Sequence, residues 1–342
     1  MLVLDALYLL LLLLSWPFWL TYVLKRSYRS LLRGRLRPQL EPSDTGSIWI
    51  HAVSVGEVRS LRSLVDALGQ SGRRVVLSVT TPAGFASARR EFPSLPVIHS
   101  PFDLSFVVRR FIGRINPRLV IFNELEVWPN WIWLLHRRRI PMLLINGRVS
   151  LAAFRRYRLF QCILRPFFLR IDAFLVQSQI YRQRFLRLRI PPERIHVCGN
   201  IKADEAERGA QELPPPGEVR AHLRLPAPER KIVVLASSHA SDEAVFIPAI
   251  ASRSRDFLFI IVPRHVQRAP GIAARLQRGG IAAALFSRLP EGEGAGPPFQ
   301  VLIYDLVGYL FAIMSIAEIV FMGGTCDARL GGHNLYEPAA LG

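Results

Sequence analysis

The alternation of short aliphatic runs with longer helical stretches constrains the fold of this chain more than any other feature. From Ser47 onward the short runs are rich in the β-branched and aliphatic residues that favour strands. The expected strands of the first half are residues 48–53, 75–79, 97–99, 119–122, 142–145 and 174–176. Helices are expected between them, for example at 59–68, 131–138 and 154–169. This alternation predicts an α/β fold with a parallel sheet covered by helices.

A second series of strands predicts a second domain. Residues 203–230 are polar and proline-rich, a composition typical of a connector. Further strands are expected beyond it, at 232–236, 257–262, 301–303 and 319–322. A length of 342 residues is also more typical of two domains than of one. We therefore expect two α/β domains, 47–202 and 231–342, that face a cleft and bind ligands at the carboxyl ends of their strands.

The amino end of the chain is strongly apolar. The nineteen residues from Ala6 to Leu24 carry no formal charge, and as a helix they would reach roughly 28 Å, about one hydrocarbon core. Asp5 precedes the run and no small-x-small cleavage site follows it, so residues 1–24 are predicted to be an uncleaved membrane anchor rather than a signal peptide. The basic segment 25–46 follows, and the positive-inside rule places everything downstream in the cytoplasm. A helix lying in the membrane interface is the alternative.

The charge balance points to an anionic partner. The chain has 44 Lys and Arg residues against 26 Asp and Glu residues, a net charge of +18, which suits nucleic acid, acidic lipid or a phosphorylated substrate. Fourteen arginines lie between Trp131 and Arg194, interleaved with aromatic residues. This segment is a candidate for holding a phosphorylated lipid at a bilayer surface. A solvated basic face is the alternative for many of these arginines.

Four charged residues of the first half are candidates for the chemistry, and three of them follow expected strands. Glu57 lies at a strand–glycine–helix junction, where a carboxylate can act as a general base, although spacing alone favours a first-turn acid stabilised by the helix dipole. Glu124 and Glu126 follow a buried strand, where carboxylates are costly unless they are paired or used; ordinary loop acids are an equal alternative. Lys202 is one of 3 lysines against 41 arginines, and its compact ammonium suits a contact with a phosphate or carboxylate.

The second half carries motifs suited to a phosphate-bearing ligand. Residues 237–239 (SSH) and 263–265 (PRH) follow strands directly and could recognise phosphate, although His239 could equally cap a helix. The glycines of 331–332 precede an expected helix and would let backbone N–H groups approach an anion. Neither GxGxxG nor a P-loop occurs, which disfavours dinucleotide oxidoreductases and NTPases. No Asp-x-Asp pair or metal-spaced His/Cys cluster occurs either, so neither a metal nor a cofactor is expected.

Taken together, these motifs resemble the Kdo transferase family, which moves 3-deoxy-D-manno-octulosonic acid (Kdo) from its CMP ester to the lipid A precursor. The motifs are, in chain order, HAVSVGE at 51–57, TPAG at 81–84, PFD at 101–103, ELEVWPN at 124–130, NGRVS at 146–150, GNIK at 199–202, SSH at 237–239, PRH at 263–265 and GGHNLYEP at 331–338. The resemblance covers nearly the whole chain. It implies two Rossmann-like domains of the GT-B type after a membrane anchor, with the acceptor bound by the first domain and CMP-Kdo by the second, which is expected to be truncated at Gly342.

The resemblance also implies roles for particular residues. Glu57 would accept the proton of the lipid hydroxyl, and Glu124 and Lys202 would stabilise the transition state. The CMP-binding residues would be Pro263, Arg264, Val307, Gly308, Tyr309, Asn334, Leu335, Tyr336 and Glu337. Transfer would invert the anomeric centre with no obligatory metal. The expected partners are CMP-Kdo, the phosphorylated lipid A precursor (lipid IVA) and an anionic membrane surface, on the cytoplasmic side of the inner membrane in lipopolysaccharide biosynthesis.

Other functions remain open at this point. One is a membrane-associated GT-B transferase with another nucleotide-sugar donor. Another is a truncated, inactive remnant that only binds lipid. A nucleic-acid-binding protein is disfavoured, because the sequence has no recognised DNA- or RNA-binding motif and a spanning anchor fits such a protein poorly.

Overall fold

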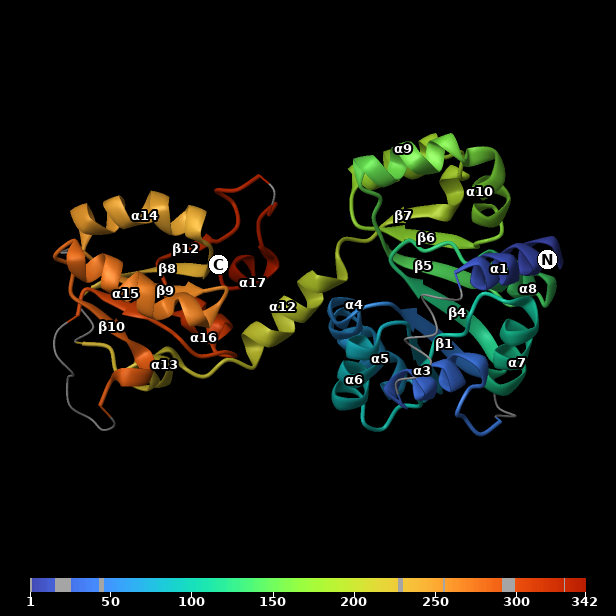
Figure 1. Cartoon of the computed structure of the whole chain (residues 1–342), viewed down its shortest axis with the longest axis horizontal. Helices are drawn as coiled ribbons and strands as arrows, with labels where there is room; N and C mark the ends of the chain where they lie inside the picture. The colour runs from blue at the N-terminus through green and yellow to red at the C-terminus, as the bar shows by residue number, and fades with distance from the viewer. Residues whose placement is uncertain are drawn as a thin grey trace. The chain divides into compact units, whose positions relative to one another are not determined.

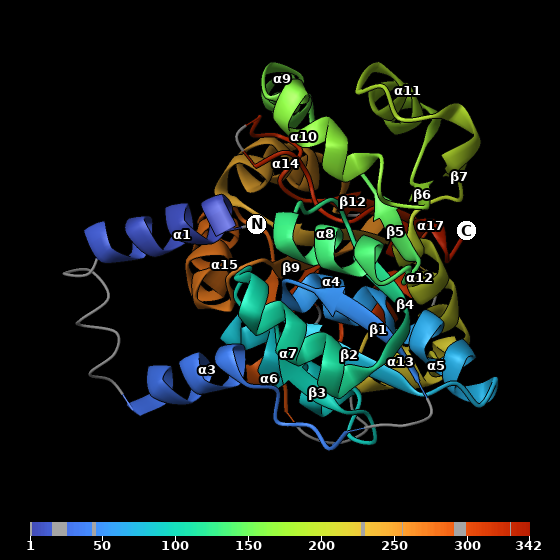
Figure 2. The same cartoon turned by 90° about the vertical axis from the view of Figure 1, so that its right-hand side faces the viewer.

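The computed structural model describes residues 2–15, 26–42, 46–226, 230–254, 256–290, 299–328 and 330–342. The chain divides into two compact units, Met1–Lys202 and Ala203–Gly342. Each unit holds one parallel sheet with helices packed against it (Figures 1 and 2). The predicted α/β fold is therefore confirmed.

The first unit is built on a seven-stranded sheet in the order β3-β2-β1-β4-β5-β6-β7. Its strands are β1 (Ser47–Ala52), β2 (Val75–Val79), β3 (Val97–His99), β4 (Pro117–Asn123), β5 (Met142–Gly147), β6 (Ala173–Val176) and β7 (Ile195–Val197). All the neighbouring pairs are parallel. β7 was not predicted, because three residues with two exposed side chains leave almost no apolar signal.

Helices cover both faces of this sheet. They are α1 (Leu2–Leu14), α3 (Arg26–Leu36), α4 (Val55–Ser60), α5 (Arg62–Gln70), α6 (Pro82–Glu91), α7 (Ser105–Ile115), α8 (Pro129–Arg137), α9 (Leu151–Leu159), α10 (Gln161–Phe168) and α11 (Gln179–Arg187). Successive side chains of β1 enter opposite cores, since side chains alternate along a strand. Trp49 packs in one core with Phe111 and Trp131, and Ile50 packs in the other with Leu61.

The predicted membrane-spanning helix at 6–24 falls only in part on the described residues. Within the described part of the chain, no helix is both long enough and apolar enough to cross a membrane. α1 ends at Leu14, and residues 16–25 lie outside the described residues. Asp5, which the sequence places as a charge flanking the apolar run, is buried. Its carboxylate accepts hydrogen bonds from Ser105 N (2.9 Å), Ser105 Oγ (2.5 Å) and Asn130 Nδ2 (3.0 Å), which attach α1 to the starts of α7 and α8.

The second unit is built on a five-stranded parallel sheet in the order β10-β11-β9-β8-β12. Its strands are β8 (Lys231–Ser238), β9 (Phe257–Pro263), β10 (Ala283–Leu285), β11 (Val301–Ile303) and β12 (Ile319–Met322). Its helices are α12 (Ile201–Gln211), which begins within the first unit, α13 (Pro216–His222), α14 (Ala240–Arg253), α15 (Ala269–Arg278), α16 (Leu310–Ser315) and α17 (Tyr336–Ala339).

The segment predicted as a connector, 203–230, contains most of α12 and all of α13. Its prolines do not interrupt α13: Pro215 precedes the helix and Pro216 is its first residue. Proline is favoured at that first position, because its φ is already helical and the helix needs no N–H donor there. A proline-rich composition was therefore compatible with a helix start as well as with a loop.

Candidate active site

In each sheet the chain first adds strands on one side of the first strand and then crosses to add a strand on its other side, which defines a switch point. In the first unit this switch point lies between β1 and β4, which are neighbours although β2 and β3 intervene in the sequence. In open α/β sheets, ligands bind at such a point, beyond the carboxyl ends of the strands. Glu57 follows β1, and Glu124 and Glu126 follow β4. The sheet therefore brings the three candidate carboxylates to the place where a ligand is expected.

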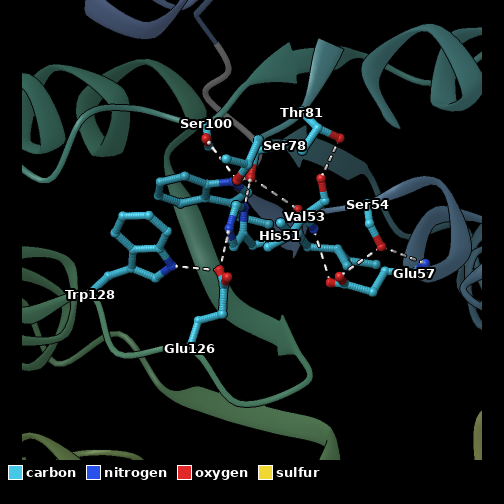
Figure 3. A network of polar contacts seen from close by, with 12 residues as sticks. His51, Val53, Ser54, Glu57, Ser78, Thr81, Ser100, Glu126 and Trp128 are labelled. Atoms are coloured by element: carbon cyan, nitrogen blue, oxygen red, sulfur yellow. Dashed lines mark hydrogen bonds and ion pairs between the residues drawn. The ribbon is translucent and has the colours of Figure 1, made fainter. Parts of the chain in front are cut away.

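Glu57 lies in the first turn of α4 and closes a ring of local hydrogen bonds (Figure 3). Its Oε2 accepts from Val53 N (2.9 Å), and its Oε1 accepts from Ser54 Oγ (3.0 Å). Burial raises the pKa of Glu57, these two donors oppose the shift, and the negative charges of Glu124 and Glu126 add to it. The net pKa lies above the ordinary glutamate value, which makes Glu57 a stronger base near neutral pH than an exposed glutamate.

Glu124 is held in an unusual backbone conformation. Its φ is 63°, in the left-handed region that costs a residue with a Cβ roughly 1–2 kcal/mol. Its N–H donates to Ile145 O (3.0 Å), and its Oε2 accepts from Arg148 Nε (2.8 Å). The carboxylates after β4 are thus paired, as their position after a buried strand requires. Backbone strain of this kind is found most often at functional sites.

Glu126 faces the sheet rather than Arg148. Its Oε2 lies 3.3 Å from His51 Nε2 and accepts a hydrogen bond from Trp128 Nε1 (2.9 Å) (Figure 3). His51 belongs to β1 and is 1% exposed. The sequence analysis did not single out His51 as functional. The sequence feature that could have identified it is a histidine inside an apolar strand, six residues before Glu57.

Lys202 also lies beyond the carboxyl end of a strand, but away from Glu57 and Glu124, the two other predicted catalytic residues. It is the second residue of α12 and follows β7, which is the edge strand and lies three positions from β4. Its backbone N–H donates to Asn200 Oδ1 (3.1 Å). The first unit therefore brings Glu57 and Glu124 together and leaves Lys202 near the boundary of the two units.

The second unit has its own switch point, between β8 and β12. His239 follows β8 and His333 lies in the loop after β12, and their Nε2 atoms are 2.9 Å apart. Burial lowers the pKa of His333, the nearby His239 and Arg264 lower it further, and Asp242 opposes them. A neutral His333 can share one proton with His239 in a hydrogen bond. This contact joins the two loops that flank the switch point.

Asp242 stabilises the two loops that this histidine contact joins. It is fully buried in the first turn of α14 and accepts three backbone hydrogen bonds, from His239 N (2.8 Å), Gly324 N (2.8 Å) and Cys326 N (3.2 Å). Burial raises the pKa of Asp242, but the three N–H donors outweigh burial and bring it below the ordinary value. One carboxylate therefore begins α14 and fixes the turn that follows β12.

Gly323, the residue after β12, has to be a glycine for a steric reason. A Cβ on Gly323 would lie 2.3 Å from Ser237 O, so only glycine allows the end of β12 to approach the end of β8 so closely. Ser237 itself has a φ of 53°, another left-handed residue at a site edge.

Eight of the nine predicted CMP-binding residues follow strands of the second sheet, and the ninth, Pro263, is the last residue of β9. Arg264 follows β9 and is exposed, and its N–H donates to Ser238 O (3.0 Å). Val307, Gly308 and Tyr309 follow β11, and the Tyr309 ring packs on His222 with centroids 4.2 Å apart. The remaining predicted residues, apart from Pro263 at the end of β9, are Asn334, Leu335, Tyr336 and Glu337 around the start of α17.

Three of these residues interact at the start of α17. Asn334 Oδ1 accepts from Tyr336 N (3.1 Å), and Asn334 Nδ2 donates to Glu337 Oε1 (3.3 Å). Glu337 is thereby oriented at the edge of the sheet. Within the residues that the structure describes, no three His, Cys, Asp or Glu side chains are placed to hold a metal ion.

Comparison with known proteins identifies similar sequences over most of the chain. Residues 28–205 match the family model of 3-deoxy-D-manno-octulosonic-acid transferase (kdotransferase). The 3-deoxy-D-manno-octulosonic acid transferase of Chlamydia pneumoniae is 31% identical over 330 residues, which is 92% of this chain and 74% of the relative. The enzyme of the same name from Bordetella pertussis is 33% identical over 310 residues, covering 86% of this chain and 69% of the relative.

Among solved structures, UDP-GlcNAc 2-epimerase from Methanocaldococcus jannaschii is similar in fold. The TM-score is 0.56 at 14% sequence identity, and the match covers 86% of this chain and 81% of the epimerase. At this identity the similarity concerns the fold alone. The two parallel α/β units thus have the GT-B-like architecture that the sequence analysis predicted.

Proposed function

This chain belongs to the 3-deoxy-D-manno-octulosonic acid transferase family, and from that premise we propose that it transfers Kdo from CMP-Kdo to a hydroxyl group of a phosphorylated lipid A precursor. It is a glycosyltransferase of lipopolysaccharide biosynthesis. The observation that best supports the proposed chemistry is the position of Glu57, a half-buried carboxylate with a raised pKa at the β1–β4 switch point.

Glu57 is the proposed proton acceptor. The acceptor hydroxyl loses its proton to Glu57 as its oxygen attacks the anomeric carbon of Kdo. The bond between that carbon and the phosphate oxygen breaks, CMP leaves with the bonding electron pair, and the anomeric centre is inverted. The hydrogen bonds from Val53 N and Ser54 Oγ hold the carboxylate in one orientation.

Fixed charges are proposed to act on the reacting centre. The anomeric carbon gains oxocarbenium character as the phosphate leaves, so positive charge builds on the sugar and negative charge on CMP. The Glu124 carboxylate, oriented by Arg148 at 2.8 Å, is suited to the first charge, and the Lys202 ammonium to the second. Preorganised charges of this kind stabilise a transition state without reorganising during the reaction.

The second unit is proposed to bind CMP. Arg264 supplies a guanidinium for the phosphate, and the loop 307–309 and residues 334–337 supply backbone and side-chain groups for the nucleoside. The common position of these residues beyond β9, β11 and β12 supports this assignment.

The location of the reaction is a separate part of the proposal. We place it at the anionic cytoplasmic surface of the inner membrane, where the lipid acceptor is held. Helices α9 and α10 support this placement, since Leu159, Phe160 and Ile163 are 74%, 51% and 61% exposed. Arg155, Arg158 and Arg165 of the same helices are also exposed. Exposed apolar and basic side chains on one pair of helices suit a contact with anionic lipid.

A transfer assay tests the function directly. The purified chain is incubated with CMP-Kdo carrying a radiolabelled sugar and with a tetraacyl disaccharide bisphosphate, and the lipid product is separated and counted. We expect label in the lipid with CMP-Kdo and none when a UDP-linked sugar replaces it. Transfer only from another nucleotide sugar, or lipid binding without transfer, would contradict the proposal.

A further inference from the structure

Two neighbouring groups of the first unit have no part in the mechanism proposed above: the buried histidine of β1 and the second carboxylate after β4. The His51 ring is enclosed by aromatic rings, with the centroids of Trp131 and Trp128 at 5.0 and 6.1 Å. Its two nitrogens each face one polar side chain (Figure 3): Nδ1 lies 2.9 Å from Ser78 Oγ, and Nε2 lies 3.3 Å from Glu126 Oε2.

The hydrogen bonds around Ser78 are compatible with a proton on Nε2 of the His51 ring. Ser78 Oγ accepts from Trp49 Nε1 (2.8 Å) and has one hydrogen to donate. His51 Nδ1 at 2.9 Å is closer to it than Ile50 O at 3.3 Å. With the hydroxyl donating to Nδ1, a ring hydrogen on Nε2 is directed toward Glu126.

The contact between His51 and Glu126 is within ion-pair distance but is not aligned as a hydrogen bond. Nε2 is buried, and among the described residues it has no hydrogen-bond partner. A buried polar atom without a hydrogen bond is costly, so its retention calls for an explanation. A small movement of Glu126 completes the bond, and Trp128 Nε1 already donates to the same carboxylate oxygen at 2.9 Å.

This contact attaches the loop that carries Glu124 to the strand that leads to Glu57. The loop spans residues 124–128, and Trp128 is the residue from which α8 begins. A second hydrogen bond also attaches the end of β4 to the segment that carries Glu57: Asn123 Nδ2 donates to Glu57 O (3.3 Å). Glu124, with its left-handed backbone, lies between these two attachments, so its carboxylate depends on both for its position.

Glu126 also acts on Glu57 through its charge. Burial is the main cause of the raised pKa of Glu57, and the Glu124 and Glu126 carboxylates add to it. Arg148 is the positive group that faces Glu57 from the loop after β5, and Tyr157 of α9 faces Glu126. Removing the charge of Glu126 while keeping its shape therefore lowers the pKa of Glu57.

We propose that His51 and Glu126 are positioning residues of the transfer reaction: their contact holds the loop 124–128 so that Glu124 stays beside Glu57. The charge of Glu126 also adds to the basicity of Glu57, of which burial is the main cause. This inference rests on the proposed function for its kinetic consequences, but its electrostatic part concerns the protein alone. Neither residue has to touch the substrate.

Two substitutions of His51 separate positioning from simple occupancy of the core. His51→Gln places an amide N–H near the position of Nε2, and His51→Asn keeps a group near Nδ1 but does not reach Glu126. We expect His51→Asn to lower kcat by roughly 10–100-fold, the loss typical of a small misplacement of catalytic groups, with the KM for CMP-Kdo unchanged. His51→Gln should recover most of that loss.

Glu126→Gln tests the charge. Its amide oxygen can still accept from Trp128 and lie beside His51 Nε2, so the loop keeps its contacts. The acid limb of the kcat/KM profile should move to lower pH, because Glu57 titrates with one negative neighbour fewer. Titrating the Glu57 carboxyl carbon by NMR should show the same direction without any substrate. The matched control is Glu91→Gln: Glu91 is 26% exposed against 30% for Glu126 and is paired with Arg62 at 3.0 Å. It should leave both readouts unchanged.

The outcomes are distinct. Wild-type kcat and pH profile in His51→Asn would overturn the positioning role, and an unchanged Glu57 titration in Glu126→Gln would overturn the electrostatic one. If His51→Asn melts far below the wild type, its kinetics are set aside, and His51→Gln with Glu126→Gln decide the question. If the wild-type protein transfers no Kdo, the proposed function fails, while the Glu57 titration still tests the role of Glu126.

Discussion

At the scale of single residues, the candidate site shows that one side chain can have a structural and a chemical role together. Glu57 was predicted either as a general base or as a first-turn acid that stabilises a helix. The structure shows the helix-stabilising contacts, with Ser54 as the N-cap and Glu57 bonded back to it. Burial nevertheless leaves the pKa of Glu57 above its ordinary value. The bonds that begin α4 are therefore also the bonds that orient the proposed base.

The Glu57→Gln variant tests this residue. The amide keeps the shape of the side chain but has no basic oxygen, so transfer should fall by the ~10²–10⁴-fold usual for loss of a general base. CMP affinity, measured by calorimetry, should change little, because CMP is assigned to the second unit. In the wild type, activity should be lost on the acid side at a higher pH than an ordinary glutamate would give. Near-normal turnover in the variant would exclude Glu57 from the role.

At the scale of elements, buried carboxylates at helix starts hold the sheet edges together. Asp242 begins α14 and binds the turn after β12. Asp103, which precedes α7, has a related role in the first unit: its carboxylate accepts from Asn130 N (3.2 Å) and Trp131 N (3.1 Å) at the start of α8 and from Tyr8 of α1 (3.3 Å). Both residues connect elements that are distant in sequence, and each connection lies next to a candidate site.

Replacing Asp242 with asparagine should loosen the second unit. An amide is uncharged and has a single acceptor oxygen, so at least one of the three N–H donors loses its acceptor, and a hydrogen bond to a charged group contributes about 1.5–3 kcal/mol. We expect a loss of stability of that order in chemical denaturation and weaker CMP binding. Glu57→Gln is the control, since it alters a carboxylate of the other unit. CMP affinity equal to that of the wild type would contradict the role given to Asp242.

Asp103 should make the stability of the first unit depend on pH. Burial, as the largest cause, raises the pKa of Asp103 to about 7. The folded state therefore holds a proton that the unfolded chain releases near pH 4. This contribution to stability is present in full below that pH and is lost as the pH rises through about 7. Urea unfolding at pH 5 and pH 8 should show a smaller difference in Asp103→Asn than in the wild type. Equal differences would exclude Asp103 as the source.

At the scale of the whole molecule, a net charge of +18 is spread unevenly over the sequence, and fourteen of the arginines lie between Trp131 and Arg194. Several of them lie on α9 and α10 beside exposed apolar side chains. Such a surface attracts anionic lipid through charge and retains it through apolar contact. Because exposed charges are screened by salt, the two contributions can be separated experimentally.

The triple variant Arg155→Gln, Arg158→Gln and Arg165→Gln tests the basic surface of α9 and α10. Each arginine near an anionic bilayer contributes about 1 kcal/mol, so three losses should weaken binding to phosphatidylglycerol vesicles by roughly 100-fold at low salt. The control is Arg275→Gln with Arg278→Gln on α15 of the second unit, which should bind as the wild type does. Equal binding of both variants at every salt concentration would exclude this surface.

The sequence by itself determined the properties that depend on local pattern. Alternating strand and helix signals predicted the α/β fold and most of the strands, because the period of apolar residues reflects which face each element buries. The order of the motifs identified the family, which the comparisons confirm. Short elements such as β7 and β10 were missed, since three residues carry too little pattern.

Only the tertiary structure decided which side chains meet. Asp5 bonds to Ser105, 100 positions away, so the charge that precedes the apolar run is the attachment point of α1. His51 of β1 contacts Glu126, which follows β4. The sequence around either residue does not predict this contact. The position of a strand in the sheet depends on the packing of all the elements together. Contacts at a switch point therefore cannot be read from spacing, although the residues that make them are present in the sequence.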